Sequence, residues 1–263
     1  MLLRAIKQVA GAAVREPSRL QKAFTIEGIR KIPNYIRQQM RKARKSALNE
    51  QRVREFRSEA WAHDGNLSSR RYDSYENYLA HQRSKLGVLL SRGVPLSDLQ
   101  HLDRFKRHLA VVTELTVPAS VLCLAARTGS EVEAFISLGH FAVGIDLNPG
   151  PNNRYVVNGD FHALQFADDS IDCVFTNSLD HALDLAKIVT EVKRVLKPGG
   201  IFLLEVYRGY DEGKVIGEWE SLHWSTAKSL AEKVSELGGF QLEAERELTA
   251  GEWPQFVLRK LKH

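Results

Sequence analysis

The sequence predicts an α/β fold in which a helical N-terminal extension precedes a mostly parallel sheet. From residue 119 onward, short apolar runs typical of buried strands alternate with amphipathic segments typical of helices. Before that point the pattern is helical, and basic residues are concentrated near the start of the chain. A length of 263 residues suits one larger α/β domain with an appendage.

Residues 1–64 are predicted to form a basic helical extension. Residues 1–60 contain 15 Lys and Arg but only 5 Asp and Glu, whereas the remaining 203 residues contain 22 basic and 27 acidic side chains. Residues 1–15 place apolar side chains on one helical face, which is typical of a membrane-surface helix, an organelle-targeting segment or a helix packed on the protein. A second basic helix is predicted from Asn34 to about residue 64.

The positive charge of this extension bears on where the protein docks and does not indicate which reaction it catalyses. An anionic membrane surface is one candidate partner for a basic arm. Nucleic acid is a weaker candidate, because the few aromatic residues are spread out and do not form a stacking platform.

Residues 65–118 are predicted to be a helical lid or connector. Asp73 followed by Glu76 predicts a cap and the start of a helix over residues 74–86. Its Tyr75, Tyr78 and His81 could cover a cleft, although an amphipathic helix usually packs through such a face. A further helix is expected over residues 96–112.

Residues 119–263 are predicted to form the main domain. The unbroken apolar run 121–125 is expected of a central parallel strand that is buried on both faces. Further strands are expected at 141–147, 155–157, 171–176 and 201–206, helices at 130–139, 183–196 and 226–237, and an antiparallel edge from 240–246 and 254–261. Because parallel neighbours need crossover connections, this order predicts a doubly wound, Rossmann-like sheet.

Composition narrows the class of protein. The longest uncharged apolar stretch, residues 115–126, is too short to span a bilayer and contains Pro118. The two cysteines cannot build a disulfide framework or a C-x-x-C zinc site, so we expect no metal and a reducing compartment. We therefore expect a cytoplasmic protein that could lie at the periphery of a membrane.

In an open α/β sheet the ligand binds at the carboxyl ends of the strands, so the residues that follow each strand are the candidates. Small residues and free helix amides follow the first strand near Gly129. Asp146 follows the second strand, where a carboxylate can accept hydrogen bonds from ribose hydroxyls. Asp160 could accept from an exocyclic amine while Phe161 covers a base. Residues 177–181 follow the fourth strand, at the centre of such a cleft.

Four motifs in order make the chain resemble the class I S-adenosylmethionine-dependent methyltransferases, especially the branch acting on small molecules. The motifs lie at residues 121–129, 144–148, 159–174 and 191–200, and the resemblance is good over about residues 119–207. It implies S-adenosyl-L-methionine as cofactor. The implied cofactor-binding residues are Ala125, Ala126, Arg127, Thr128 and Gly129 for the methionine part, Asp146 for the ribose, Leu147, Gly159, Asp160 and Phe161 around the adenine, and Asn177 at the sulfonium end.

The first motif departs from the family pattern. That pattern reads acidic-x-Gly-x-Gly-x-Gly, and here Cys123, Ala125 and Arg127 occupy the first three of those places. Loss of the acidic residue removes an anchor for the cofactor, and Arg127 would have to point away from it. The chain is also similar to a sub-branch that reads Ala-Arg-x-Gly-x-Glu, in which Arg127 and Glu131 could act as a functional pair.

Methyl transfer is an in-line displacement, so positioning can suffice and a base is needed only for a hydroxyl acceptor. His181 is the candidate base and Asp180 the candidate carboxylate at the acceptor, although His181 could instead cap the following helix. The expected function is methyl transfer to a hydroxyl or carboxyl of a small molecule, glycan or lipid-linked sugar. The alternatives are a non-catalytic scaffold on this fold and an RNA methyltransferase recruited by the basic extension.

Overall fold

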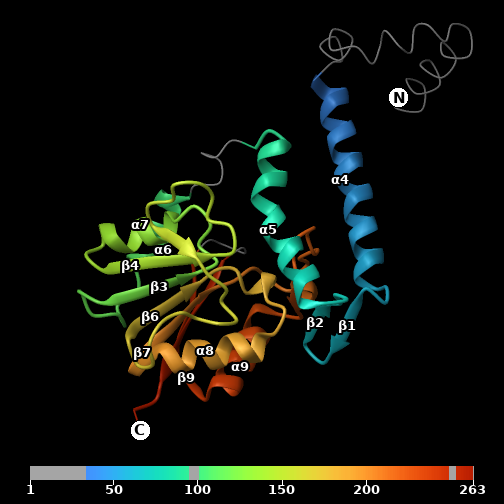
Figure 1. Cartoon of the computed structure of the whole chain (residues 1–263). Coiled ribbons are helices and arrows are strands. Elements are labelled where there is room, and N and C mark those ends of the chain that lie inside the picture. Colours follow the sequence, from blue (N-terminus) through green and yellow to red (C-terminus); the bar gives the residue numbers. More distant parts are fainter. Residues whose placement is uncertain (1–33, 95–100, 249–252, 263) are drawn as a thin grey trace, which may run out of the picture. The chain divides into compact units, whose positions relative to one another are not determined.

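The computed structural model describes residues 34–94, 101–248 and 253–262 (Figure 1). The predicted helix over residues 1–15 and the start of the helix predicted at 96–112 lie outside the described residues. The chain divides into two compact units, residues 1–51 and 52–263. In the first unit the described part is helix α4 (Asn34–Phe56) up to residue 51, a largely exposed and basic segment.

The second unit is built on a seven-stranded sheet in the order β5-β4-β3-β6-β7-β10-β9. The strands are β3 (Ser120–Leu124), β4 (Phe141–Asp146), β5 (Val156–Asn158), β6 (Ile171–Thr176), β7 (Leu196–Glu205), β9 (Phe240–Glu247) and β10 (Pro254–Lys260). The first five strands are parallel, and β10 and β9 add the antiparallel edge. The predicted doubly wound fold with its antiparallel C-terminal edge is confirmed. Strand order reverses at β3, which places the ligand crevice beside its carboxyl end.

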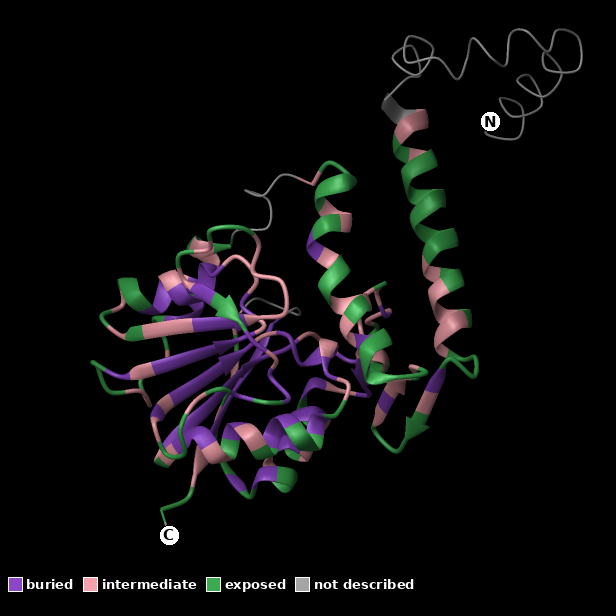
Figure 2. Ribbon diagram, in the orientation of Figure 1, coloured by how far each residue is buried: buried purple, intermediate pink, exposed green. Residues whose placement is uncertain are grey.

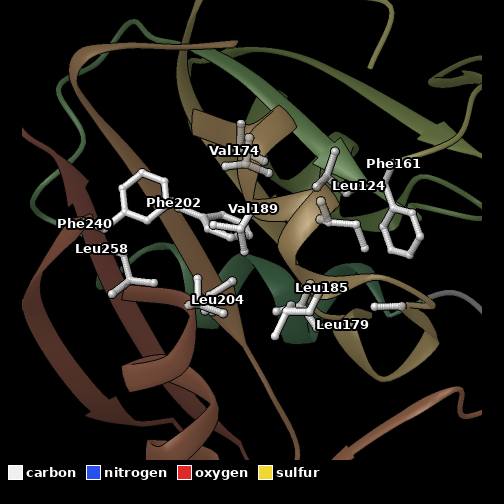
Figure 3. Close-up of a cluster of buried hydrophobic side chains, with 14 of the residues drawn as sticks. Leu124, Phe161, Val174, Leu179, Leu185, Val189, Phe202, Leu204, Phe240 and Leu258 are labelled. Atoms are coloured by element: carbon white, nitrogen blue, oxygen red, sulfur yellow. The ribbon is translucent and has the colours of Figure 1, made fainter. Parts of the chain in front are cut away.

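Helices cover both faces of this sheet because its central strands are apolar on both faces (Figure 2). Helices α6 (Leu102–Leu109) and α7 (Ser130–Ser137) pack on one face through Phe105, Val132 and Phe135. Helices α8 (Leu185–Val195) and α9 (Ala227–Gly238) cover the other. Figure 3 shows the cluster of buried apolar side chains on this second face, in which Leu185 and Val189 of α8 lie with strand residues such as Phe202.

Helix α5 (Tyr75–Ser91) begins one residue later than the sequence pattern predicts. Its cap is Ser74, whose hydroxyl accepts a hydrogen bond from the backbone N–H of Asn77. The prediction of Asp73 as the cap is therefore wrong, because the Ser74 hydroxyl already satisfies a free amide of the first turn.

A second, three-stranded sheet was not expected from the sequence. It consists of β1 (Trp61–Asp64), β2 (Leu67–Arg70) and β8 (Leu222–Trp224), all antiparallel. The basic helix predicted to reach about residue 64 instead ends at Phe56. The predicted domain boundary at 64/65 falls in the turn of the β1–β2 hairpin, and the three predicted domains remain a prediction.

No helix within the described ranges is both long enough and apolar enough to cross a bilayer.

Candidate active site

Two adjoining hollows lie at the carboxyl ends of the central strands, and we call them the first and second hollow. The first lies between α5 and the ends of β3 and β4. It is lined by Tyr78, Gln82, Lys85, Leu86, Ala125, Arg127, Asp146, Leu147, Asn148, Gly159, Phe161, Ser178 and His181. The second extends toward α6 and the segment after β7. Both hollows are lined by Lys85, Ala125, Arg127, Ser178 and His181, so they meet there.

Asp146 orders the loop that follows β3. Its Oδ2 accepts a hydrogen bond from the backbone N–H of Arg127 at 2.9 Å, and its Oδ1 accepts from the backbone N–H of Asn148 at 2.8 Å. The Asn153 amide donates to the Arg127 carbonyl at 2.9 Å. These bonds hold Ala125 and Arg127 at φ values of 53° and 42°, in the left-handed region that non-glycine residues rarely occupy. Arg127 lines both hollows.

Gly129 lets this loop pack closely against Tyr155 and Val156. It has φ +85°, and a Cβ there would lie 2.9 Å from the Tyr155 Cβ and 3.0 Å from a Val156 methyl. Only glycine combines this conformation with so close an approach to β5. Gly129 lines neither hollow, whereas the neighbouring Ala126 and Thr128 line the second.

Asp160 belongs to a hydrogen-bond network beside the first hollow. One carboxylate oxygen accepts from both the backbone N–H and the ring of His162, each at 2.9 Å, and the other accepts from the Tyr75 hydroxyl. His162 Nε2 accepts from the backbone N–H groups of Leu183 and Asp184, so Nδ1 carries the hydrogen and donates to Asp160. Burial opposes the charge of Asp160, but these hydrogen bonds outweigh it and lower its pKa. Asp160 itself lines neither hollow, although its neighbours Gly159 and Phe161 line the first.

Lys85, His181 and Asp180 form a buried group where the hollows meet. His181 Nδ1 lies 2.9 Å from the Trp219 carbonyl, which can only accept, so Nδ1 carries the hydrogen. Its Nε2 therefore accepts from the Lys85 Nζ at 2.5 Å. Burial and the Lys85 charge lower the pKa of His181 to about 3, and burial lowers the pKa of Lys85 to about 8. His181 is neutral as a result, and the lone pair of its Nε2 accepts the hydrogen bond from Lys85.

The remaining predicted residues fall on the second hollow. Asn177 and Asp180 line it, and burial raises the pKa of Asp180. The alternative role of His181 as a helix cap is wrong, because Asp184 caps α8 by accepting from the Lys187 backbone N–H.

Several lining residues were not predicted from the sequence. Lys85 lies on the same face of α5 as Tyr78 and Gln82, and this helical spacing is the one signal that could have indicated it. The others come from distant segments and carry no local signal: Arg104, Tyr207, Lys214, Trp219 and Trp253.

The sequence suggests Glu131 only as a possible functional partner of Arg127. Its side chain lines the second hollow yet is only 5% exposed, and burial raises its pKa to about 8. No ion pair joins it to Arg127 in the part of the chain that the structure describes. Its carboxyl nevertheless contributes to the raised pKa of the Cys123 thiol, so it lies near the place where the family pattern has its acidic residue.

Across the described ranges, no group of three or more His, Cys, Asp or Glu side chains is placed to hold a metal ion.

The strand order and the position of the crevice beside β3 are those of a class I methyltransferase fold. Residues 122–204 match the family model described as a methyltransferase domain, and the chain has the class I fold that its motifs predicted.

Similarity to individual proteins is partial. A malonyl-[acyl-carrier protein] O-methyltransferase of Coxiella burnetii is 34% identical over 93 residues, which are 33% of each chain. A sterol 24-C-methyltransferase of Aspergillus fumigatus is 47% identical over 47 residues, 18% of this chain and 12% of that one. The chain thus spans a third or less of the length of these curated relatives.

A solved structure shares the fold over a larger part of the chain. It is the 1,6-didemethyltoxoflavin-N1-methyltransferase of Burkholderia thailandensis with its substrate and S-adenosylhomocysteine bound. The TM-score is 0.58 at 19% identity, over 77% of this chain and 99% of that one.

Proposed function

We propose that this protein transfers a methyl group from S-adenosylmethionine to a hydroxyl or carboxyl oxygen of a small molecule, with the adenosyl part of the cofactor in the first hollow and the acceptor in the second. The observation that carries this proposal is the junction of the two hollows at Ala125, Ser178 and the Lys85–His181 pair. A methyl donor and an acceptor placed in the two hollows would meet there.

The first hollow suits an adenosine. Asp146 has lone pairs left after its two backbone hydrogen bonds, and these can accept from ribose hydroxyls. Leu147 and Phe161 offer apolar surface for the adenine. Asp160 uses three of about four acceptor positions on its carboxylate, which leaves one for the adenine amino group.

We assign the amino-acid end of the cofactor to Arg127 and Glu131, next to Thr128 and Asn177. That end is a zwitterion, so it needs one cation and one anion, and both side chains line the second hollow where it adjoins the loop after β3. Glu131 would supply the carboxylate that Cys123 lacks. Its buried carboxyl has no cation within ion-pair distance among the described residues, so an ammonium group would compensate its charge.

The cofactor supplies an electrophilic methyl group, and the residues of the junction hold the acceptor oxygen in line with it. A carboxylate acceptor has no proton to lose, so Lys85 and His181 would only position it. A hydroxyl acceptor would give its proton to His181 Nε2 only after Lys85 has lost its charge and its hydrogen bond to that nitrogen, because the Lys85 charge lowers the pKa of His181. Asp180, whose carboxyl lies 3.7 Å from His181 Nε2, would contact the acceptor at this junction.

The name of the Coxiella relative, an O-methyltransferase, supports an oxygen acceptor. Docking of the basic extension on an anionic membrane surface is a separate proposal. It rests on the excess of Lys and Arg over Asp and Glu in residues 1–60. Sedimentation with anionic liposomes that is lost when residues 1–15 are deleted would support it, and unchanged sedimentation would contradict a role for that segment.

Calorimetry with S-adenosylhomocysteine tests the proposed function. We expect binding by the full chain, and about 30-fold weaker binding by Asp146→Ala, because that change removes charge-assisted hydrogen bonds worth about 2 kcal/mol. Asp168→Ala is the matched control, since Asp168 is an exposed carboxylate paired with Arg194. Absence of binding, or equal binding by Asp146→Ala and wild type, would contradict the proposal.

A further inference from the structure

Two cations in the second hollow are held by aromatic rings. The Arg104 guanidinium lies 4.4 Å from the centre of the Trp253 ring, and Trp253 packs on Tyr207 with ring centres 4.2 Å apart. Lys214 Nζ lies 3.8 Å from the centre of the Tyr207 ring. All four side chains line the second hollow, so the two rings separate two positive charges that face the same space.

Neither cation has a carboxylate partner within ion-pair distance in the described parts of the chain. The Arg104 Nε is buried and has no hydrogen-bond partner there. Arg92, which also lines this hollow, is by contrast neutralised by Glu218 at 2.7 Å. A cation–π contact stabilises a positive charge without using its N–H groups, so those donors remain available to a ligand.

The acidic side chains of the second hollow do not cancel these charges. Glu218 is used by Arg92. Burial raises the pKa of Glu131 to about 8, which favours its neutral form. Asp180 makes no ion pair with Arg104 or Lys214 in the described residues. Glu220 is the fourth carboxyl on this surface, and it makes no ion pair with Arg104 or Lys214.

We propose that the methyl acceptor carries a carboxylate or phosphoryl group that binds between Arg104 and Lys214. This inference rests on the proposed function, since it names the chemical class of the molecule in the second hollow. The cofactor's own carboxylate is already served by Arg127 on the loop after β3, whereas Lys214 lies in the segment after β7, on the far side of β6. Apolar groups of the same hollow, such as Phe105 and Trp219, would contact the uncharged body of the acceptor.

Small aromatic probes test this site directly. The full chain, saturated with S-adenosylhomocysteine, is titrated with benzoate, phenyl phosphate and the neutral benzamide, and tryptophan fluorescence is followed because Trp253 lies in the site. We expect saturable binding of at least one anion and none of benzamide. The stronger of the two anions identifies carboxylate or phosphoryl as the recognised group.

The variants Lys214→Gln and Arg104→Gln should each weaken anion binding by about tenfold or more. Lys233→Gln, which changes an exposed lysine paired with Glu236 on α9, should match wild type. No saturable anion binding, equal binding of benzamide, or variants that bind the anion like wild type would overturn the inference.

Affinity for S-adenosylhomocysteine distinguishes acceptor from cofactor. Both variants should bind it within about twofold of wild type, and a tenfold loss would assign the two cations to the cofactor and overturn the inference. Anion titrations of the unliganded chain report the site even if S-adenosylhomocysteine does not bind, so this inference and the proposed function can fail separately.

Discussion

The two hollows share five residues but are built differently. The first is lined by α5 and by the segments that follow β3, β4, β5 and β6, and Asp146 is the one carboxylate among its described lining residues. The second adds residues from α6, from the segment after β7 and Trp253, which directly precedes β10, and its cations outnumber its carboxyl groups. The proposed cofactor side therefore depends mainly on residues that directly follow strands, whereas the proposed acceptor side depends on which distant segments the fold brings together.

The largest expected effect is a loss of stability caused by a substitution in the loop after β3. Gly129→Ala should destabilise the protein by about 3 kcal/mol, because alanine is strained at φ +85° and its Cβ would press on Tyr155 and Val156. Gly213→Ala separates the two causes, since Gly213 has φ +89° but no atom within 4 Å of the added Cβ. We expect this control to lose about 1 kcal/mol in urea unfolding. Equal losses for both variants would contradict the proposed close contact with β5.

A smaller effect tests the assignment of Glu131 to the cofactor's amino group. In the free protein Glu131 is mainly protonated below about pH 8, and an ammonium partner favours its ionised form. Binding of S-adenosylhomocysteine should therefore release a proton, and affinity should fall by up to about tenfold per pH unit between about pH 8 and about pH 6. Calorimetry in buffers of different ionisation enthalpy measures the proton.

Glu131→Gln should bind about tenfold more weakly at about pH 8 and should lose this proton release. Glu133→Gln, two residues along the same helix at a position that lines neither hollow, should behave like wild type. Proton release that persists in Glu131→Gln would show that another group titrates.

The smallest effect concerns the cover that α5 forms over the first hollow. Tyr75→Phe removes the hydrogen bond to Asp160, and since Tyr75 is 36% exposed we expect a loss of about 1 kcal/mol or less in unfolding free energy. S-adenosylhomocysteine affinity should change by less than about threefold. Tyr210→Phe is the control, because its hydroxyl makes no hydrogen bond in the described residues. A tenfold or larger loss of affinity in Tyr75→Phe would mean that this hydroxyl contacts the cofactor.

The sequence predicted the main sheet well because its strands are buried on both faces. Unbroken apolar runs such as 121–125 and 173–175 are typical of a central parallel strand, and Asp146 lies at the end of the neighbouring strand β4. The same logic located the first hollow. Lys214 and Trp253 could not be predicted, because only the β7–β10 pairing and the packing of Tyr207 bring them together.

The small sheet was missed for a different reason. Its strands have three or four residues, too short for an alternating pattern, and two of them precede the main domain while β8 lies near the C-terminus. The Asp64-Gly65 pair is a common hairpin signal, but it was interpreted as the end of the basic helix. Trp61, which is 2% exposed, belongs to this sheet rather than to a solvated helix.

We propose that the first hollow binds the adenosyl group of the cofactor and that the second binds the acceptor. A structure of the full chain with S-adenosylhomocysteine bound tests this proposal most directly. We predict adenine beside Leu147 and Phe161, both ribose hydroxyls on Asp146, and the sulfur at the junction near Ser178 and the Lys85–His181 pair, with Arg104 and Lys214 left free. An adenosyl group bound in the second hollow, or a cofactor carboxylate seated between Arg104 and Lys214, would contradict the account.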